Sequence, residues 1–126
     1  MLLHLGLTIN NYNDVDDFYK KLLGFNELRK FELDAKTARQ LFSIDKEVQV
    51  ILLQKENLTI ELFLTPSKQQ NVYNHVCIEV QKKEELVKEA SNMGYPVITL
   101  ERENRDNIYF LKDLSNNTFE LKSKRG

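Results

Sequence analysis

The chain contains an internal duplication: each half carries the same short patterns in the same order. The segment from Leu3 to Ile9 resembles the segment from Asn74 to Val80, and each segment contains one of the two histidines of the chain. Leu23-Gly24-Phe25 recurs as Met93-Gly94-Tyr95, at nearly the same distance after the histidine. Self-similarity of this kind indicates repeated structural units, so we expect two similar modules.

A second match adds one glutamate to each half. Leu58 to Phe63 resembles Asn117 to Lys122, and the glutamates of these segments fall at corresponding places. Duplicated modules tend to pack about a pseudo-two-fold axis, which would bring two imidazoles and two carboxylates toward one point. Such side chains are common ligands of divalent metals. The candidate ligands are His4, Glu61, His75 and Glu120.

Length and composition exclude several classes of protein. With 126 residues, the chain fits one domain over residues 1–126. The net charge of −1 gives no reason to expect a nucleic-acid partner, and the basic residues from Lys122 to Arg125 are simply explained as a solvated terminus. One cysteine excludes an internal disulfide and suits a reducing compartment. No apolar run reaches the length of a membrane span. We therefore expect a cytoplasmic protein.

Hydrophobic periodicity predicts a βαβββ order in module one, about residues 1–66. Alternating apolar residues predict strands, and the stripe of Val15, Phe18, Tyr19 and Leu22 predicts a helix that Gly24 ends. Residues 34–45 are predicted to be irregular or partly helical. The predicted strands are residues 3–9, 25–33, 48–54 and 58–64.

Module two, about residues 72–122, repeats this order. A helix is predicted over residues 84–93, with Leu86, Ala90 and Met93 facing inward and Gly94 ending it. The fold class is therefore α+β. A helix that covers one face of such a sheet leaves the other face open for residues out of phase with the apolar stripe. The predicted strands are residues 75–80, 97–100, 108–112 and 118–122.

All the candidate ligands are out of phase with the apolar residues around them. Glu61, for example, stands between Ile60 and Leu62. Polar residues alternate in this way in any sheet with one solvated face, which is a purely structural explanation for each residue alone. The joint pattern of two His and two Glu at corresponding places favours a shared site.

The order and spacing of these residues resemble those of the vicinal oxygen chelate superfamily, which includes glyoxalase I, methylmalonyl-CoA epimerase, extradiol dioxygenases and the fosfomycin and bleomycin resistance proteins. This resemblance implies two βαβββ modules that form a cup-shaped mixed sheet around a divalent metal, with His4, Glu61, His75 and Glu120 as its ligands. The resemblance rests on His4-Leu5-Gly6-Leu7, on the run from Asp17 to Phe25, on Ile60-Glu61-Leu62, on His75-Val76-Cys77-Ile78 and on Phe119-Glu120-Leu121.

The ligand set is most similar to that of glyoxalase I (lactoylglutathione lyase). It implies a lyase or isomerase that transfers a proton on a small oxygenated substrate through a metal-stabilised enediolate. Glu120 is the first candidate for the base and Glu61 the second. Mixed imidazole and carboxylate ligation suits Ni, Zn, Co or Mn.

The chain also departs from the glyoxalase pattern. The last hairpin has Asp113-Leu114-Ser115-Asn116-Asn117 where many members have Asp-Pro-x-Gly, and the run from Glu101 to Asn107 contains no glycine. A glutathione adduct is therefore disfavoured as the substrate. Arg102 and Arg105 in that run are either anion ligands or solvated charges. Cys77 shares the phase of His75, so it either lines the cup or fills space in the core.

Two other functions remain open. The chain could be a metal-free ligand-sequestering protein of the bleomycin-resistance type, or a scaffold domain without a small ligand. Short members of the superfamily commonly dimerise, so the resemblance implies a homodimer, with the site either within one chain or shared between two. Retention of all four ligand types favours the metal-dependent enzyme.

Overall fold

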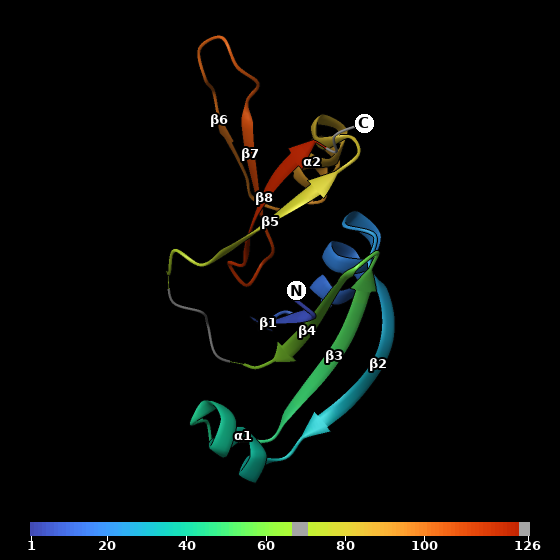
Figure 1. Ribbon diagram of the computed structural model, residues 1–126, viewed down its shortest axis with the longest axis vertical. Helices are drawn as coiled ribbons and strands as arrows, with labels where there is room; N and C mark the ends of the chain where they lie inside the picture. The colour runs from blue at the N-terminus through green and yellow to red at the C-terminus, as the bar shows by residue number, and fades with distance from the viewer. Residues whose placement is uncertain (67–70, 124–126) are drawn as a thin grey trace. The chain divides into compact units, whose positions relative to one another are not determined.

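The computed structural model describes residues 1–66 and 71–123, and the chain divides into two compact units, Met1–Gln69 and Gln70–Gly126 (Figure 1). Each unit contains one four-stranded mixed sheet with few helices, as the α+β prediction required. None of the helices in the described part of the chain has the length and hydropathy needed to cross a membrane.

Unit one follows the predicted βαβββ order with one further helix. Its sheet has the order β1-β4-β3-β2; β1 runs parallel to β4 and the other pairs are antiparallel. The elements are β1 (His4–Ile9), the π-helix η1 (Val15–Leu22), β2 (Asn26–Leu33), α1 (Ala35–Phe42), β3 (Val48–Lys55) and β4 (Leu58–Leu64).

Unit two repeats the same topology. Its sheet has the order β5-β8-β7-β6, in which β5 runs parallel to β8 and the other pairs are antiparallel. Helix α2 packs against β6, β7 and β8. The elements are β5 (His75–Val80), α2 (Lys83–Asn92), β6 (Val97–Leu100), β7 (Ile108–Lys112) and β8 (Thr118–Ser123).

The first helix buries the predicted apolar stripe. Val15, Phe18, Tyr19 and Leu22 are all buried. The helix ends where the Leu23 amide donates to the Phe18 carbonyl at 2.9 Å and Gly24 adopts a φ of 82°. A side chain is strained at such a φ, which explains why a glycine stands there.

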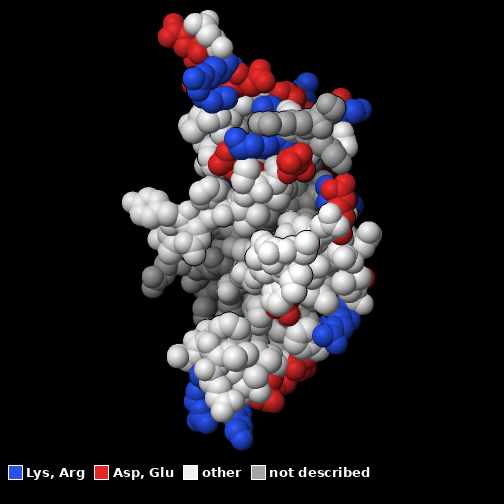
Figure 2. All heavy atoms as spheres, in the orientation of Figure 1, with Lys and Arg blue, Asp and Glu red and all other residues white. Residues whose placement is uncertain are grey.

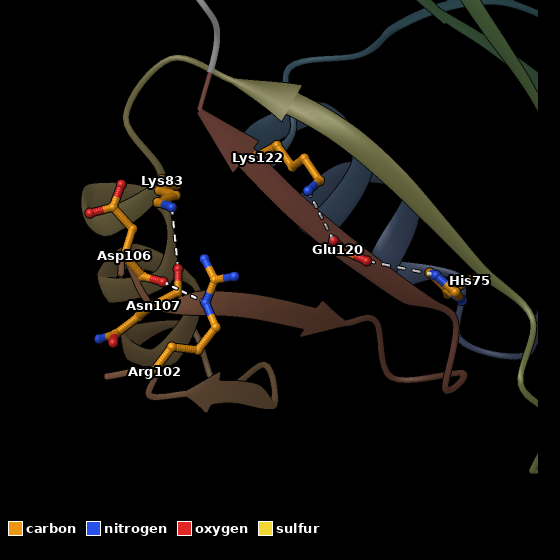
Figure 3. Close-up of polar contacts among 7 residues, drawn as sticks. All are labelled: His75, Lys83, Arg102, Asp106, Asn107, Glu120 and Lys122. Carbon is orange, nitrogen blue, oxygen red and sulfur yellow. Dashed lines mark hydrogen bonds and ion pairs between the residues drawn. The ribbon is translucent and has the colours of Figure 1, made fainter. Parts of the chain in front are cut away.

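The buried face of α2 differs from the prediction. Val87 and Ala90 are buried together with Lys83, whereas Leu86 and Met93 are half-exposed. Lys83 can occupy this face because its aliphatic stem packs while its Nζ donates to the Asn107 carbonyl at 3.3 Å (Figure 3). The same Nζ lies 5.7 Å from the centre of the Tyr109 ring. The apolar pattern of the sequence did not predict that this residue faces inward, because lysine is charged.

Side chains alternate along each strand between a buried core face and an open face of the sheet. In β4, Ile60 and Leu62 are fully buried while Glu61 between them is partly exposed. In β8, Phe119 and Leu121 are buried while Glu120 is partly exposed. On the face drawn in Figure 2, basic and acidic side chains of the described residues are intermixed, as the near-neutral net charge suggests.

The core of unit two gives a direct stability prediction. Leu111 on β7 is fully buried. Leu111→Ala should lower the free energy of unfolding by about 2–5 kcal/mol, because it removes buried methyl groups and leaves a cavity. Lys88→Ala on the exposed side of α2 is the control, and it should change stability by less than about 0.5 kcal/mol. Urea unfolding measures both, and equal effects would contradict the assigned core.

The capping residue of α1 gives a pH prediction. The Thr37 amide donates to Asp34 Oδ1 at 2.7 Å, and this backbone hydrogen bond lowers the pKa of Asp34. A carboxyl whose folded pKa is lowered stabilises the fold above its unfolded pKa of about 3.9, and this stabilisation is lost as the pH falls through the folded value. The difference in urea midpoint between wild type and Asp34→Asn should therefore favour wild type more at about pH 7 than at about pH 2. A pH-independent difference would contradict the assignment.

Candidate functional site

Parallel pairing of β1 with β4 brings His4 and Glu61 together in unit one. His4 is the register partner of Thr59, and Gly6 is the partner of Glu61. His4 Nε2 lies 2.9 Å from Glu61 Oε1, with the imidazole about half-exposed and the carboxylate mostly covered. The pair lies on the open face, as the phase of both residues predicted.

The same register in unit two brings His75 and Glu120 together. His75 is the partner of Thr118, and Cys77 is the partner of Glu120. His75 Nε2 lies 3.7 Å from Glu120 Oε1 (Figure 3), and the two side chains are exposed to nearly the same extent as their counterparts. The duplication thus extends from the sequence to the geometry of the candidate residues.

The structure brings the candidate ligands together as two pairs. Within residues 1–66 and 71–123, no three His, Cys, Asp or Glu side chains lie close enough together to hold a metal ion. Each unit by itself supplies one imidazole nitrogen and one carboxylate oxygen on an open sheet face. The four-ligand site remains a prediction.

Hydrogen bonds give the two imidazoles different protonation patterns. His75 Nδ1 lies 3.0 Å from the Tyr73 carbonyl. A carbonyl can only accept, so His75 Nδ1 carries a proton, and Nε2 of a neutral His75 carries none. Histidines that bind metals commonly have their other nitrogen held in this way. In contrast, the 2.9 Å contact of His4 Nε2 with Glu61 makes Nε2 of a neutral His4 the donor.

The residue opposite each glutamate differs between the two units. Glycine at position 6 makes room for the Phe63 ring. A Cβ at Gly6 would crowd that ring, because it would lie only 3.1 Å from Phe63 Cε2. Cys77 is exposed on the open face, so it is not the buried filler that sequence reasoning also allowed. Desolvation, followed by the negative charge of Glu120, raises the pKa of the Cys77 thiol. A protonated thiol is a poor nucleophile and metal ligand.

The residue two positions after each glutamate differs as well. Phe63 packs edge-on against Phe42 of α1, with ring centres 5.5 Å apart. Lys122 instead places Nζ 3.7 Å from Glu120 Oε2 (Figure 3). Sequence reasoning missed Lys122 because it begins a basic run that was assigned to a solvated terminus. Its even spacing from Glu120 on a strand was the signal that could have found it.

Arg102, which the sequence left as either an anion ligand or a solvated charge, has a local structural role. The Arg102 Nε–H donates to the Asp106 carbonyl at 2.9 Å (Figure 3). This bond links the two ends of the run between β6 and β7. Arg102 is thereby engaged with its own loop.

The chain resembles known proteins in both sequence and fold. Residues 3–111 match the family model described as the Glyoxalase/Bleomycin resistance protein/Dioxygenase superfamily. No curated protein matches the chain.

Several solved structures share the fold. A glyoxalase family protein from Bacillus cereus has a TM-score of 0.77 and 16% identity, over 99% of this chain and 94% of that chain. The fosfomycin resistance protein FosX from Listeria monocytogenes has a TM-score of 0.74 and 16% identity, over 99% of this chain and 93% of that chain. A further FosX structure, with a TM-score of 0.73 and 16% identity over 99% of this chain and 90% of that chain, is complexed with Mn(II) and a sulfate ion. At these identities the likeness shows the fold alone.

The hydrogen bonds of the two imidazoles predict opposite neutral tautomers. In metal-free protein at about pH 8.5, where imidazoles are ordinarily neutral, His4 should carry its proton on Nε2 and His75 on Nδ1. Two-bond ¹⁵N–¹H NMR correlations distinguish the tautomers, and His4→Gln and His75→Gln assign the signals. Finding the Nε2–H tautomer at His75 would contradict the role given to the Tyr73 carbonyl.

Proposed function

The chain belongs to the glyoxalase/bleomycin resistance protein/dioxygenase superfamily, and from that premise we propose that it is a divalent-metal-dependent lyase or isomerase. It would transfer a proton on a small oxygenated substrate, in the manner of glyoxalase I. The observation that carries the proposal is the repeated His–Glu pair, since both units place an imidazole nitrogen beside a carboxylate oxygen in the same register.

The N···O spacing within each pair is close to that of two ligands on one metal ion. Two ligands at about 2.1 Å from one ion lie roughly 3.0–3.4 Å apart for octahedral or tetrahedral angles. The observed N···O distances of 2.9 Å and 3.7 Å fall on either side of this range. Imidazole and carboxylate donors together suit Ni, Zn, Co or Mn. His4, Glu61, His75 and Glu120 would hold the metal in this proposal.

A bound divalent cation would stabilise the negative charge that develops on a substrate oxygen during proton removal. Glu120 would take the proton from the adjacent carbon and return it at the neighbouring position. The His75–Glu120 contact is longer than the His4–Glu61 contact, so His75 holds the Glu120 carboxylate less firmly than His4 holds Glu61. This difference favours Glu120 as the base, with Glu61 as the second candidate.

One observation favours the alternative of a metal-free ligand-sequestering protein. Phe42 is half-exposed and packs edge-on against Phe63, which lies two residues from Glu61 on the open face of β4. Exposed aromatic rings can stack on a flat ligand. In this function His4 would keep its 2.9 Å contact with Glu61, and His75 would stay beside Glu120, without a metal.

Metal content distinguishes the two functions. Protein that has been stripped and then reconstituted with Ni, Co, Zn or Mn should bind about one ion per chain by elemental analysis. His4→Ala and Glu120→Ala should lose that ion because each removes one ligand. Glu89→Ala changes an exposed carboxylate on α2 and should retain it. If no form of the protein binds metal, the sequestering function becomes the better explanation.

The role of Glu120 is tested on metal-loaded protein by screening hemithioacetals and acyl-CoA esters for turnover. Glu120→Gln should lower kcat by about 10²–10⁴-fold, because an amide cannot accept the proton. Metal content is measured beside activity, so that loss of the ion is not mistaken for loss of the base. Full turnover of a metal-loaded Glu120→Gln protein would exclude Glu120 and point to Glu61.

A further inference from the structure

We infer that Lys122 anchors an anionic group of the substrate, a carboxylate or a phosphate, beside Glu120. The inference rests on the proposed function because it places this group next to the proposed base. It restricts the substrate class to small oxygenated acids or phosphate esters.

The position of Lys122 follows from the register of β8. Lys122 is two residues after Glu120, so both side chains lie on the open face of the sheet. The two oxygens of the Glu120 carboxylate face in different directions: Oε1 toward His75 Nε2 and Oε2 toward Lys122 Nζ, each at 3.7 Å (Figure 3). A substrate that reaches Glu120 therefore comes within reach of the Lys122 ammonium.

The Lys122 ammonium can accept a new partner. Its side chain is 64% exposed, and its 3.7 Å contact with Glu120 is longer than a hydrogen bond. Exposed ion pairs of this kind contribute little stability, so the contact is easily exchanged. Lys112 on the same face is already engaged, because its Nζ donates to Thr118 Oγ1 at 2.7 Å and to Asn116 Oδ1 at 3.2 Å.

The electrostatics of the open face require a cation at this place if the substrate is an anion. Glu79 is the register partner of Lys122 on β5, and Glu120 lies on its other side along β8. Two carboxylates on the same sheet face would repel a negatively charged substrate. The positive charge of Lys122 on that face offsets the repulsion.

Apolar residues extend from Lys122 across the same face. The β7–β8 pairing ends at Tyr109 and Leu121, and the next residues along the two strands are Ile108 and Lys122. Leu100 of β6 is the register partner of Ile108. Leu100 is about half-exposed and Ile108 is partly covered. A short carbon chain can rest on these side chains while its charged end contacts Lys122.

Unit one has no cation at the corresponding position. Phe63 occupies the corresponding place in β4 and packs against Phe42. The two units therefore share the His–Glu register but differ in charge beside the glutamate. Because only unit two has a lysine beside the glutamate, we assign the anion-binding role to unit two.

Two matched probes test the inference. Dihydroxyacetone phosphate and dihydroxyacetone share a carbonyl and a hydroxyl on adjacent carbons, and they differ in the phosphate. Calorimetric titration of wild type should show tighter binding of the phosphate ester by about tenfold or more, as charge-assisted hydrogen bonds provide. Lys122→Gln should abolish most of that preference, Lys122→Arg should restore it, and Lys88→Gln on α2 should leave it unchanged.

The outcomes separate this inference from the proposed function. Titrations use both manganese-loaded and metal-free protein, and metal content is measured for each variant. If metal binds but Lys122→Gln keeps the phosphate preference, or weakens both probes equally, the inference fails while the proposed function stands. Absence of any preference in wild type also overturns it. If no metal binds but a Lys122-dependent preference persists, the proposed function fails and the anion site stands.

Discussion

Parallel pairing between the first and last strand of each unit is the constraint on which the candidate site depends. β1 pairs with β4 and β5 with β8, with the histidine opposite a threonine in both cases. Side chains alternate along a strand, so a slip of one residue would turn either histidine to the core face and separate it from its glutamate. The buried residues on each side of Glu61 and Glu120 oppose such a slip, because their apolar side chains would then face solvent.

Much of this arrangement is predictable from local pattern. The strands at residues 75–80, 97–100 and 108–112 have the predicted bounds, and Glu61 and Glu120 lie on the open face that their phase required. Period-2 alternation encodes these features directly. The π-helical form of η1 and the inward position of Lys83 depend on tertiary packing, so the pattern of one segment could not reveal them. The predicted grouping of four ligands depends on how the two modules associate. Alternation within one strand does not encode that association.

The duplicated scaffold carries different chemistry in its two copies. Gly6 and Cys77 stand opposite the glutamates, and Phe63 and Lys122 stand two residues beyond them. The register that holds each His–Glu pair is the same in both units, so these neighbours can change while the pair is kept. One unit thus presents aromatic surface beside its carboxylate, and the other presents a positive charge.

The sheet order also sets the sequence of events during synthesis. β1 is made first, but its partner β4 is the last strand of its unit. The β3–β4 hairpin closes a short loop, whereas β1 must join across most of the unit, so we expect β1 to dock last. His4 then meets Glu61 only when its unit is otherwise complete. Because unit two repeats this order, we expect the His–Glu pair of each unit to be among the last contacts formed when that unit folds.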